Sequence, residues 1–178
     1  LSDLHGEHEA FIHMLKSASG TIKDKIDEHY GAVLSEADRE GLAALIYNAE
    51  AELARRRKSE KNFDDWCATA IYRLITICKS VSTKYTRSRV RQRLPKYAGY
   101  SMDELLHADD EANRSHYYSQ IIRSIVDCGM AEEYIIELTE AISRLAVDHL
   151  HIIGDIFDRG AHPDSIMDYL EHYHAVDF

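Results

Sequence analysis

Residues 149–160 read HLHIIGDIFDRG, and this stretch decides how the chain is interpreted. The apolar run that ends at Ile153 meets Gly154 and Asp155 directly, which is typical of a buried β-strand that leads into a loop. The loop holds two acids and an arginine between two glycines, and glycine lets a backbone turn sharply or approach a bound ion closely. The stretch therefore predicts a strand over 149–153, followed by a candidate active-site loop over 154–160.

Helical patterns flank this strand and loop on both sides in the sequence. After the loop, Pro163 suits the first turn of a helix, and apolar residues follow it at helical spacing. At the front of the chain, the letters SDLHG at residues 2–6 precede a second helical pattern over 7–18. Both ends of the chain therefore join chemically active side chains to a helix.

Two acids, a histidine and an arginine carry the candidate chemistry. Asp3 and His5 flank one residue, so both side chains can turn toward a single cation, although a pair of this kind also occurs as a helix cap beside a surface histidine. In the loop, Asp155 can bridge two metal ions, and Arg159 can hold a phosphate with its planar guanidinium. Both blocks together favour phosphoester chemistry at a metal centre over a structural acidic turn.

The region 21–147 reads as a succession of helices. Ser35 begins a capping box, and apolar residues then recur at threes and fours, which predicts one long amphipathic helix over 36–58. Asn62 is expected to cap the next helix, and Pro95 to end the basic helix that follows it. Further helices are expected at 101–107, 115–128 and 131–147, with Gly129 between the last two.

The composition excludes several classes of protein. The chain of 178 residues is too long for a disulfide-stapled mini-protein, and it has no apolar stretch of about 18 residues that could span a membrane. Its 21 basic and 31 acidic residues give a formal charge of −10, which disfavours general nucleic-acid binding. Cys67, Cys78 and Cys128 form neither a disulfide framework nor a zinc finger, so we expect a reducing, cytoplasmic location.

A basic stretch over 79–98 stands out against this acidic background, because it contains seven bases and no acid. Its ordinary interpretation is a solvated face of a helix. It could also bind a phosphorylated effector or an acidic neighbouring subunit. The residues that would make such a contact are Lys84, Arg87, Arg89, Arg91, Arg93 and Lys96.

The order Asp-x-His, then Gly-Asp-x-x-Asp-Arg, resembles the first two motif blocks of the calcineurin-like metallophosphoesterases. The large helical region between the blocks, and the residues around each of them, resemble the class III fructose-1,6-bisphosphatases. The resemblance implies an α/β metallophosphoesterase fold, a four-layer αββα sandwich in the full protein, of which this segment is predominantly α-helical. It divides the chain into the start of a catalytic domain at 1–20, a helical insertion at 21–147 and a return to the catalytic domain at 148–178.

The resemblance also assigns a role to each residue of the two blocks. Asp3 and His5 would bind one metal ion, and Asp155 would bridge two. Asp158 would orient a catalytic histidine, and Arg159 would contact the substrate phosphate. Two divalent ions are implied, with Mn²⁺ favoured, because mixed carboxylate and imidazole ligands suit it.

The implied activity is the hydrolysis of fructose 1,6-bisphosphate to fructose 6-phosphate and phosphate in gluconeogenesis, in a homo-oligomer controlled by nucleotide or phosphoenolpyruvate effectors, without nucleic-acid or membrane partners. The family's next block, Gly-Asn-His-Asp, would follow Phe178, so we expect a segment cut from a longer polypeptide and inactive by itself. Two alternatives stay open: a calcineurin-like phosphatase for a phosphoprotein, nucleotide or dinucleoside polyphosphate, and a helical interaction module without catalysis.

Overall fold

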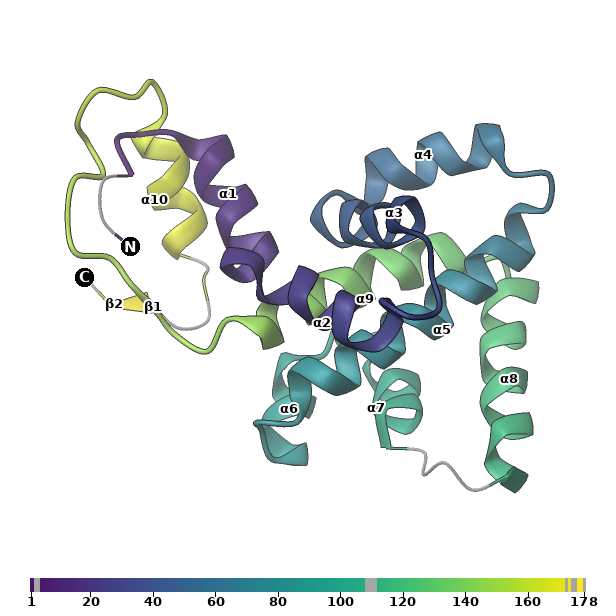
Figure 1. Cartoon of the computed structure of the whole chain (residues 1–178). Helices are drawn as coiled ribbons and strands as arrows, with labels where there is room; N and C mark the ends of the chain where they lie inside the picture. The colour runs from purple at the N-terminus through teal and green to yellow at the C-terminus, as the bar shows by residue number, and fades with distance from the viewer. Residues whose placement is uncertain (2–3, 108–111, 172, 174–175, 178) are drawn as a thin grey trace.

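The computed structural model describes residues 1, 4–107, 112–171, 173 and 176–177. It is mostly helical with a small two-stranded sheet, so the predicted helical character of the segment is confirmed. Figure 1 shows two parts, with α1, α10 and both strands on one side and the larger group of helices on the other. Within the described residues, each helix is too short or too polar to cross a membrane.

The order of the elements along the chain explains these two parts, because the first and last elements share the smaller one. The elements are α1 (His8–Ser17), the short 3₁₀ turn η1 (Ala18–Gly20), α2 (Thr21–Tyr30), α3 (Glu36–Tyr47), α4 (Ala49–Ser59), α5 (Phe63–Ser82), α6 (Arg87–Arg93), α7 (Gly99–His107), α8 (Ala112–Asp127), α9 (Ala131–Ala146), β1 (Leu150–His151), α10 (Pro163–Glu171) and β2 (Val176–Asp177).

The core of the larger part is formed by α5 and α9, which pack against each other along their apolar sides. Full burial of one large apolar side chain stabilises a fold by about 1.5–3 kcal/mol. Because α5 and α9 bury many such side chains against each other, their packing dominates the stability of the helical part. Its most deeply buried side chains include Ile71, Leu74, Ile75 and Ile77 of α5 and Ile135 and Leu138 of α9.

The helix ends follow the predicted signals closely. The Ser35 hydroxyl accepts a hydrogen bond from the backbone of Asp38 at 3.1 Å, and the Asn62 side chain caps α5 in the same way. The basic helix α6 ends before Pro95, and Gly129 separates α8 from α9 with a φ of +72°, in the left-handed region that favours glycine. These local predictions are confirmed.

The prediction of one long helix over 36–58 is wrong, because the chain breaks at Asn48 into α3 and α4. Asn48 has φ −150° and ψ 78°, and its side chain accepts a hydrogen bond from the backbone of Ala51 at 3.4 Å. Asparagine is a favoured N-cap because its side chain competes for backbone donors. Leu45 of α3 and Leu53 of α4 are both buried in the same core. The apolar spacing of the sequence therefore continues across the break.

The smaller part has a core of its own, formed by α1, α10 and the residues around β1. Strand β1 pairs in parallel with β2, with Leu150 opposite Val176 and His151 opposite Asp177. Leu150 and Ile152 point into this core, whereas Ile153 is 79% exposed. Regular pairing covers less than the predicted strand over 149–153, but the Ile152 amide still donates to the Asp177 carbonyl at 2.9 Å. The four-layer sandwich and the predicted domain boundaries stay predictions.

The cysteines give a direct test of the larger core. Burial raises the pKa of the Cys67 and Cys78 thiols to about 12, whereas Cys128 is exposed after α8. Because the thiolate is the reactive form, we expect a thiol reagent at pH 8 to modify Cys128 in the folded protein and the other two only after unfolding. Mass spectrometry of peptides after brief labelling measures this order. Equal labelling of all three under native conditions would contradict the placement of α5.

Candidate metal and phosphate site

The N-terminal segment and the Gly154–Gly160 loop meet through their backbones. The His5 amide donates a hydrogen bond to the Asp155 carbonyl at 2.7 Å. The His162 amide, just after the loop, donates to the Gly6 carbonyl at 3.2 Å. Two stretches at opposite ends of the sequence are therefore held side by side, which brings most of the predicted site residues together.

The side chains of His5, Asp155 and Asp158 converge in this contact. Each offers one ligand atom, and these atoms lie within 4.8 Å of one another. His5 Nδ1 lies 3.9 Å from the Asp158 carboxylate, and the His5 side chain is 28% exposed. Two carboxylates with one imidazole fit a divalent ion such as Mn²⁺, Fe²⁺ or Zn²⁺. Asp3, the remaining predicted ligand, lies outside the described residues.

The backbone around this group is in the left-handed region at several positions. The φ angles are +46° at His5, +42° at Asp155 and +70° at Arg159, and glycine takes the same region at Gly6 and Gly154. A residue with a side chain pays about 1–2 kcal/mol for such a conformation, and it is kept only where the surroundings enforce it. The strain therefore lies where the candidate ligands are, which is common at functional sites.

Two glycines explain how the backbones approach so closely. A Cβ atom added at Gly6 would lie 2.9 Å from the Gly160 carbonyl carbon, and one added at Gly160 would overlap the His5 carbonyl oxygen. The sequence predicted that the loop glycines allow a close approach to ions. That prediction stays untested, and the structure shows a further role: Gly6 and Gly160 lie against each other, so their small size sets the distance between the N-terminal segment and the loop.

Arg159 lies at the outer side of the loop. Its Nε is 3.1 Å from the Asp158 carboxylate, and its side chain is 77% exposed. A guanidinium has five N–H donors in a planar fork, so this ion pair leaves donor directions for an anion. Asp158 thus lies between His5 and Arg159 and can orient both side chains.

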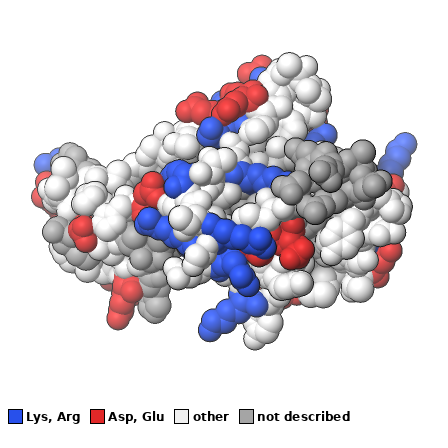
Figure 2. Space-filling view, turned by 90° about the horizontal axis from the view of Figure 1, so that it is seen from below, with Lys and Arg blue, Asp and Glu red and all other residues white. Residues whose placement is uncertain are grey.

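The predicted basic stretch centres on α6. Figure 2, seen from the side on which α6 lies in Figure 1, shows lysines and arginines gathered near the middle of the face with acidic side chains beside them. Arg87 Nη2 lies 2.7 Å from the Asp103 carboxylate, and Arg91 Nε lies 3.7 Å from it. The Asp103 side chain is only 5% exposed. Two of the predicted effector contacts are therefore used inside the fold, to join α6 to α7.

The other cations of the stretch gather around Tyr85. The guanidinium carbons of Arg89 and Arg93 lie 5.1 and 4.5 Å from the centre of its ring, within the range of a cation–π interaction. Lys84 pairs with Asp148 at 3.2 Å. Lys96 is exposed beyond the end of α6. The sequence did not predict this internal compensation, because Asp103 and Asp148 lie outside the basic stretch.

One acidic residue near β1 was missed altogether. Sequence reasoning did not single out Asp177. The structure places the Asp177 carboxylate 2.7 Å from His149 Nε2. The spacing of His149 and His151 could have indicated that both lie on one face of a strand. The pairing of β1 with β2, which adds Asp177, could not be deduced from spacing.

Comparison with known proteins places this geometry in a family context. The family model described as Firmicute fructose-1,6-bisphosphatase matches residues 1–178. The "Fructose-1,6-bisphosphatase class 3" of Clostridium acetobutylicum is 52% identical over 178 residues, and the protein of the same name from Clostridium tetani is 49% identical. "Fructose-1,6-bisphosphatase class 3 1" of Clostridium beijerinckii is 51% identical.

These alignments cover 99% of this chain but only 27% of each of the three relatives. The chain therefore spans about a quarter of the length of the curated relatives it matches. No solved structure matches it.

The glycine contact can be tested by hydrogen exchange. Gly160→Ala places a methyl group against the His5 carbonyl oxygen, so the N-terminal segment and the loop must separate. We expect the amide hydrogens of His5 and His162 to exchange at least about tenfold faster, since their acceptors move away. The control is Gly99→Ala in the helical part, where the added methyl makes an ordinary contact with Leu94 Cβ at 3.4 Å. Unchanged exchange at His5 in Gly160→Ala would contradict the close contact.

The pKa of Asp103 predicts how its ion pairs respond to pH. Burial alone would raise this pKa, but the hydrogen bond and charge of Arg87, with His107 and Arg91, outweigh burial and hold it below the ordinary 3.8. Because the folded pKa is the lower one, the carboxylate stabilises the fold above that ordinary value, and this contribution is lost as the pH falls through the folded pKa.

We therefore expect Asp103→Asn to reduce the free energy of unfolding by about 1–3 kcal/mol at pH 7, because buried charge-assisted hydrogen bonds are lost. The difference from the parent should shrink as the pH falls below 3.8. Denaturant titrations at several pH values measure both effects. Asp127→Asn, an exposed carboxylate at the end of α8, is the matched control, and an equal loss in both variants would refute the structural role of Asp103.

Proposed function

The chain belongs to the Firmicute fructose-1,6-bisphosphatase family, and from this membership we propose that the protein hydrolyses fructose 1,6-bisphosphate to fructose 6-phosphate and inorganic phosphate. The observation that carries the proposal is the convergence of His5, Asp155 and Asp158 from opposite ends of the sequence. In this proposal the reaction serves gluconeogenesis and releases the 1-phosphate of the sugar.

The proposed site holds two divalent ions, with Mn²⁺ favoured. Asp3 and His5 would hold one ion, and Asp155 would be shared by both. The imidazole of His5 and the carboxylate of Asp155 support this assignment, because their donor atoms lie within 4.8 Å of each other. Hydrolysis of a phosphate monoester needs a barrier reduction of about 20 kcal/mol or more, and bound divalent ions supply an activated water and neutralise phosphate charge.

The chain's own residues have separate tasks in this proposal. Arg159 binds the substrate phosphate through its planar donors, and its exposure leaves it accessible to a ligand. Asp158 orients a catalytic histidine, and its position between Arg159 and His5 suits an orienting carboxylate. The contact between Gly6 and Gly160 keeps the two ligand segments at a fixed distance, so that substrate binding need not organise them.

The proposed fold of the complete catalytic domain is a four-layer αββα metallophosphoesterase sandwich. Ile153 and Phe157 support it, because they are 79% and 70% exposed beside β1 and would be covered by further layers. A cytoplasmic location is also proposed. The free thiols of Cys67, Cys78 and Cys128 are consistent with a reducing compartment.

We further propose a homo-oligomer that responds to nucleotide or phosphoenolpyruvate effectors through the basic stretch. The exposed side chains of Arg87, Arg89 and Arg91 on α6 support a role for this surface, since a guanidinium has more donors than one partner uses. Because Arg87 and Arg91 share Asp103, an anion bound there would compete with the link between α6 and α7. Such competition would couple effector binding to the position of α6.

The proposed activity is tested with the intact protein, Mn²⁺ and a panel of phosphoesters. We expect phosphate release to be fastest from fructose 1,6-bisphosphate and to stop when Mn²⁺ is chelated. Preference for a phosphoprotein, a nucleotide or a dinucleoside polyphosphate would replace the proposed substrate while keeping the site. Absence of turnover for every ester would favour a helical interaction module instead.

Asp155→Asn tests the site itself. The substitution keeps the size of the side chain and removes the charge that two ions would share, so we expect loss of turnover together with weaker Mn²⁺ binding. Asp164→Asn, an exposed carboxylate in the first turn of α10, is the matched control and should keep both properties. Full activity and normal metal content in Asp155→Asn would remove Asp155 from the proposed centre.

A further inference from the structure

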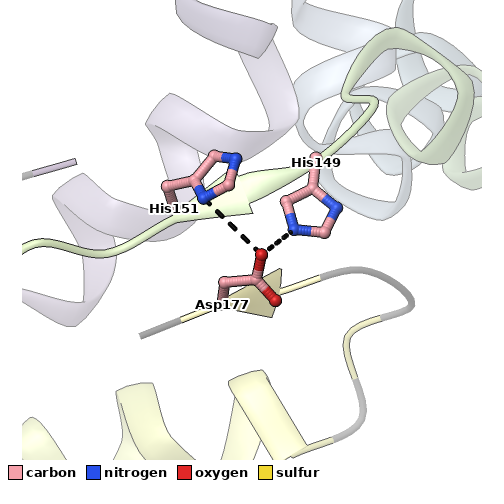
Figure 3. A group of neighbouring side chains, drawn as sticks. All are labelled: His149, His151 and Asp177. Atoms are coloured by element: carbon pink, nitrogen blue, oxygen red, sulfur yellow. Dashed lines mark hydrogen bonds and ion pairs between the residues drawn. The ribbon is translucent and has the colours of Figure 1, made fainter.

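A second group of potential metal ligands lies on the exposed side of the small sheet. Figure 3 shows His149, directly before β1, and His151 in β1, with the Asp177 carboxylate of β2 pointing at both. One ligand atom from each residue lies within 4.8 Å of the others. Successive odd residues of a strand share a face, and the β1–β2 register places Asp177 opposite His151. The pairing of two short strands therefore builds the group.

The spacing of these atoms suits a small tetrahedral ion. The Asp177 oxygen lies 2.7 Å from His149 Nε2 and 3.7 Å from His151 Nδ1. Zinc bonds of about 2.0–2.2 Å imply ligand atoms about 3.3 Å apart, and this value lies between the two distances. The imidazole rings are already near each other, with centroids 4.6 Å apart. Small side-chain rotations would complete three ligand bonds and leave a fourth position for a water molecule or a further ligand.

The neighbouring basic side chains contact Asp148 rather than Asp177. Asp177 faces two imidazoles, and nearby Lys84 is paired with Asp148. Arg93 also approaches Asp148, donating to its carbonyl oxygen. Within the described residues, Lys84 and Arg93 therefore contact Asp148, and the Asp177 carboxylate is left to the two imidazoles.

We propose that His149, His151 and Asp177 form a zinc-binding site separate from the candidate catalytic centre. Its two nitrogen donors and one oxygen favour Zn²⁺ over Mn²⁺, because imidazole suits zinc and affinities at such sites rise from manganese toward the end of the first-row series. The centre at His5 has the opposite balance, with one imidazole and two carboxylates. A bound ion would tie β1 to β2 and so hold the strand that leads into the catalytic loop.

The test uses the intact protein with Asp155→Asn, so that the candidate catalytic centre does not compete for the ion. Calorimetric titration with Zn²⁺ measures affinity, and titration with Co²⁺ reports four-coordinate ligation through its visible absorption. We expect His149→Gln or His151→Gln to weaken Zn²⁺ binding at least about tenfold and to remove the Co²⁺ bands. His29→Gln, an exposed histidine on α2, is the control and should change neither.

A second measurement avoids substitutions that could disturb folding. Histidines of the unsubstituted protein are labelled with diethyl pyrocarbonate, with and without Zn²⁺, and the labelled peptides are identified by mass spectrometry. We expect Zn²⁺ to protect His149 and His151 while His29 stays reactive. Equal labelling with and without the ion, or equal Zn²⁺ affinity in the His149→Gln and His29→Gln proteins, would overturn the proposal and leave two imidazoles hydrogen-bonded to a carboxylate.

Discussion

The close backbone contact between the N-terminal segment and the Gly154–Gly160 loop is the constraint on which the rest of the candidate centre depends. The hydrogen bond from the His5 amide to the Asp155 carbonyl fixes the two segments, and the Gly6–Gly160 pair sets how near they come. Without this contact, His5 and Asp155 would belong to distant stretches of chain, and their side chains would not converge. The left-handed backbone at both residues shows that the surroundings impose the arrangement, since neither residue adopts it freely.

The folded helical part lowers the chain-entropy cost of forming this contact. Closing a flexible loop of about 150 residues costs on the order of 4 kcal/mol in chain entropy, before any constant term. Here the intervening chain is folded around α5 and α9, and its two exits lie together, because the Ser143 hydroxyl of α9 donates to the Lys16 carbonyl of α1 at 3.5 Å. The core of the helical part thus holds the start of β1 near the end of α1. A large insertion between two motif blocks is compatible with a precise site for this reason.

Local features of the fold could be predicted from the sequence, and pairings between distant segments could not. The caps at Ser35 and Asn62 are decided within four residues, so spacing is enough to find them. The break at Asn48 was missed because the apolar rhythm continues through it, although asparagine itself was a signal. The acidic partners of the basic stretch could not be predicted from the sequence, since Asp103 meets Arg87 only after the chain turns from α6 into α7. At the candidate centre, the motifs singled out His5, Asp155 and Asp158, which the structure brings together, whereas the close approach of Gly6 to Gly160 came from the structure.

The two ligand groups around β1 differ because the backbone changes direction between them. Along the strand, the period of two keeps His149 and His151 on the exposed face while Leu150 and Ile152 enter the core. At Gly154, φ is +148°, and at Asp155 it is +42°, so the alternation ends and the next carboxylate turns toward His5. One strand therefore presents nitrogen-rich ligands before the turn and oxygen-rich ligands after it. Since ligand softness selects the ion, this turn would give the two proposed sites different metal preferences without a change of fold.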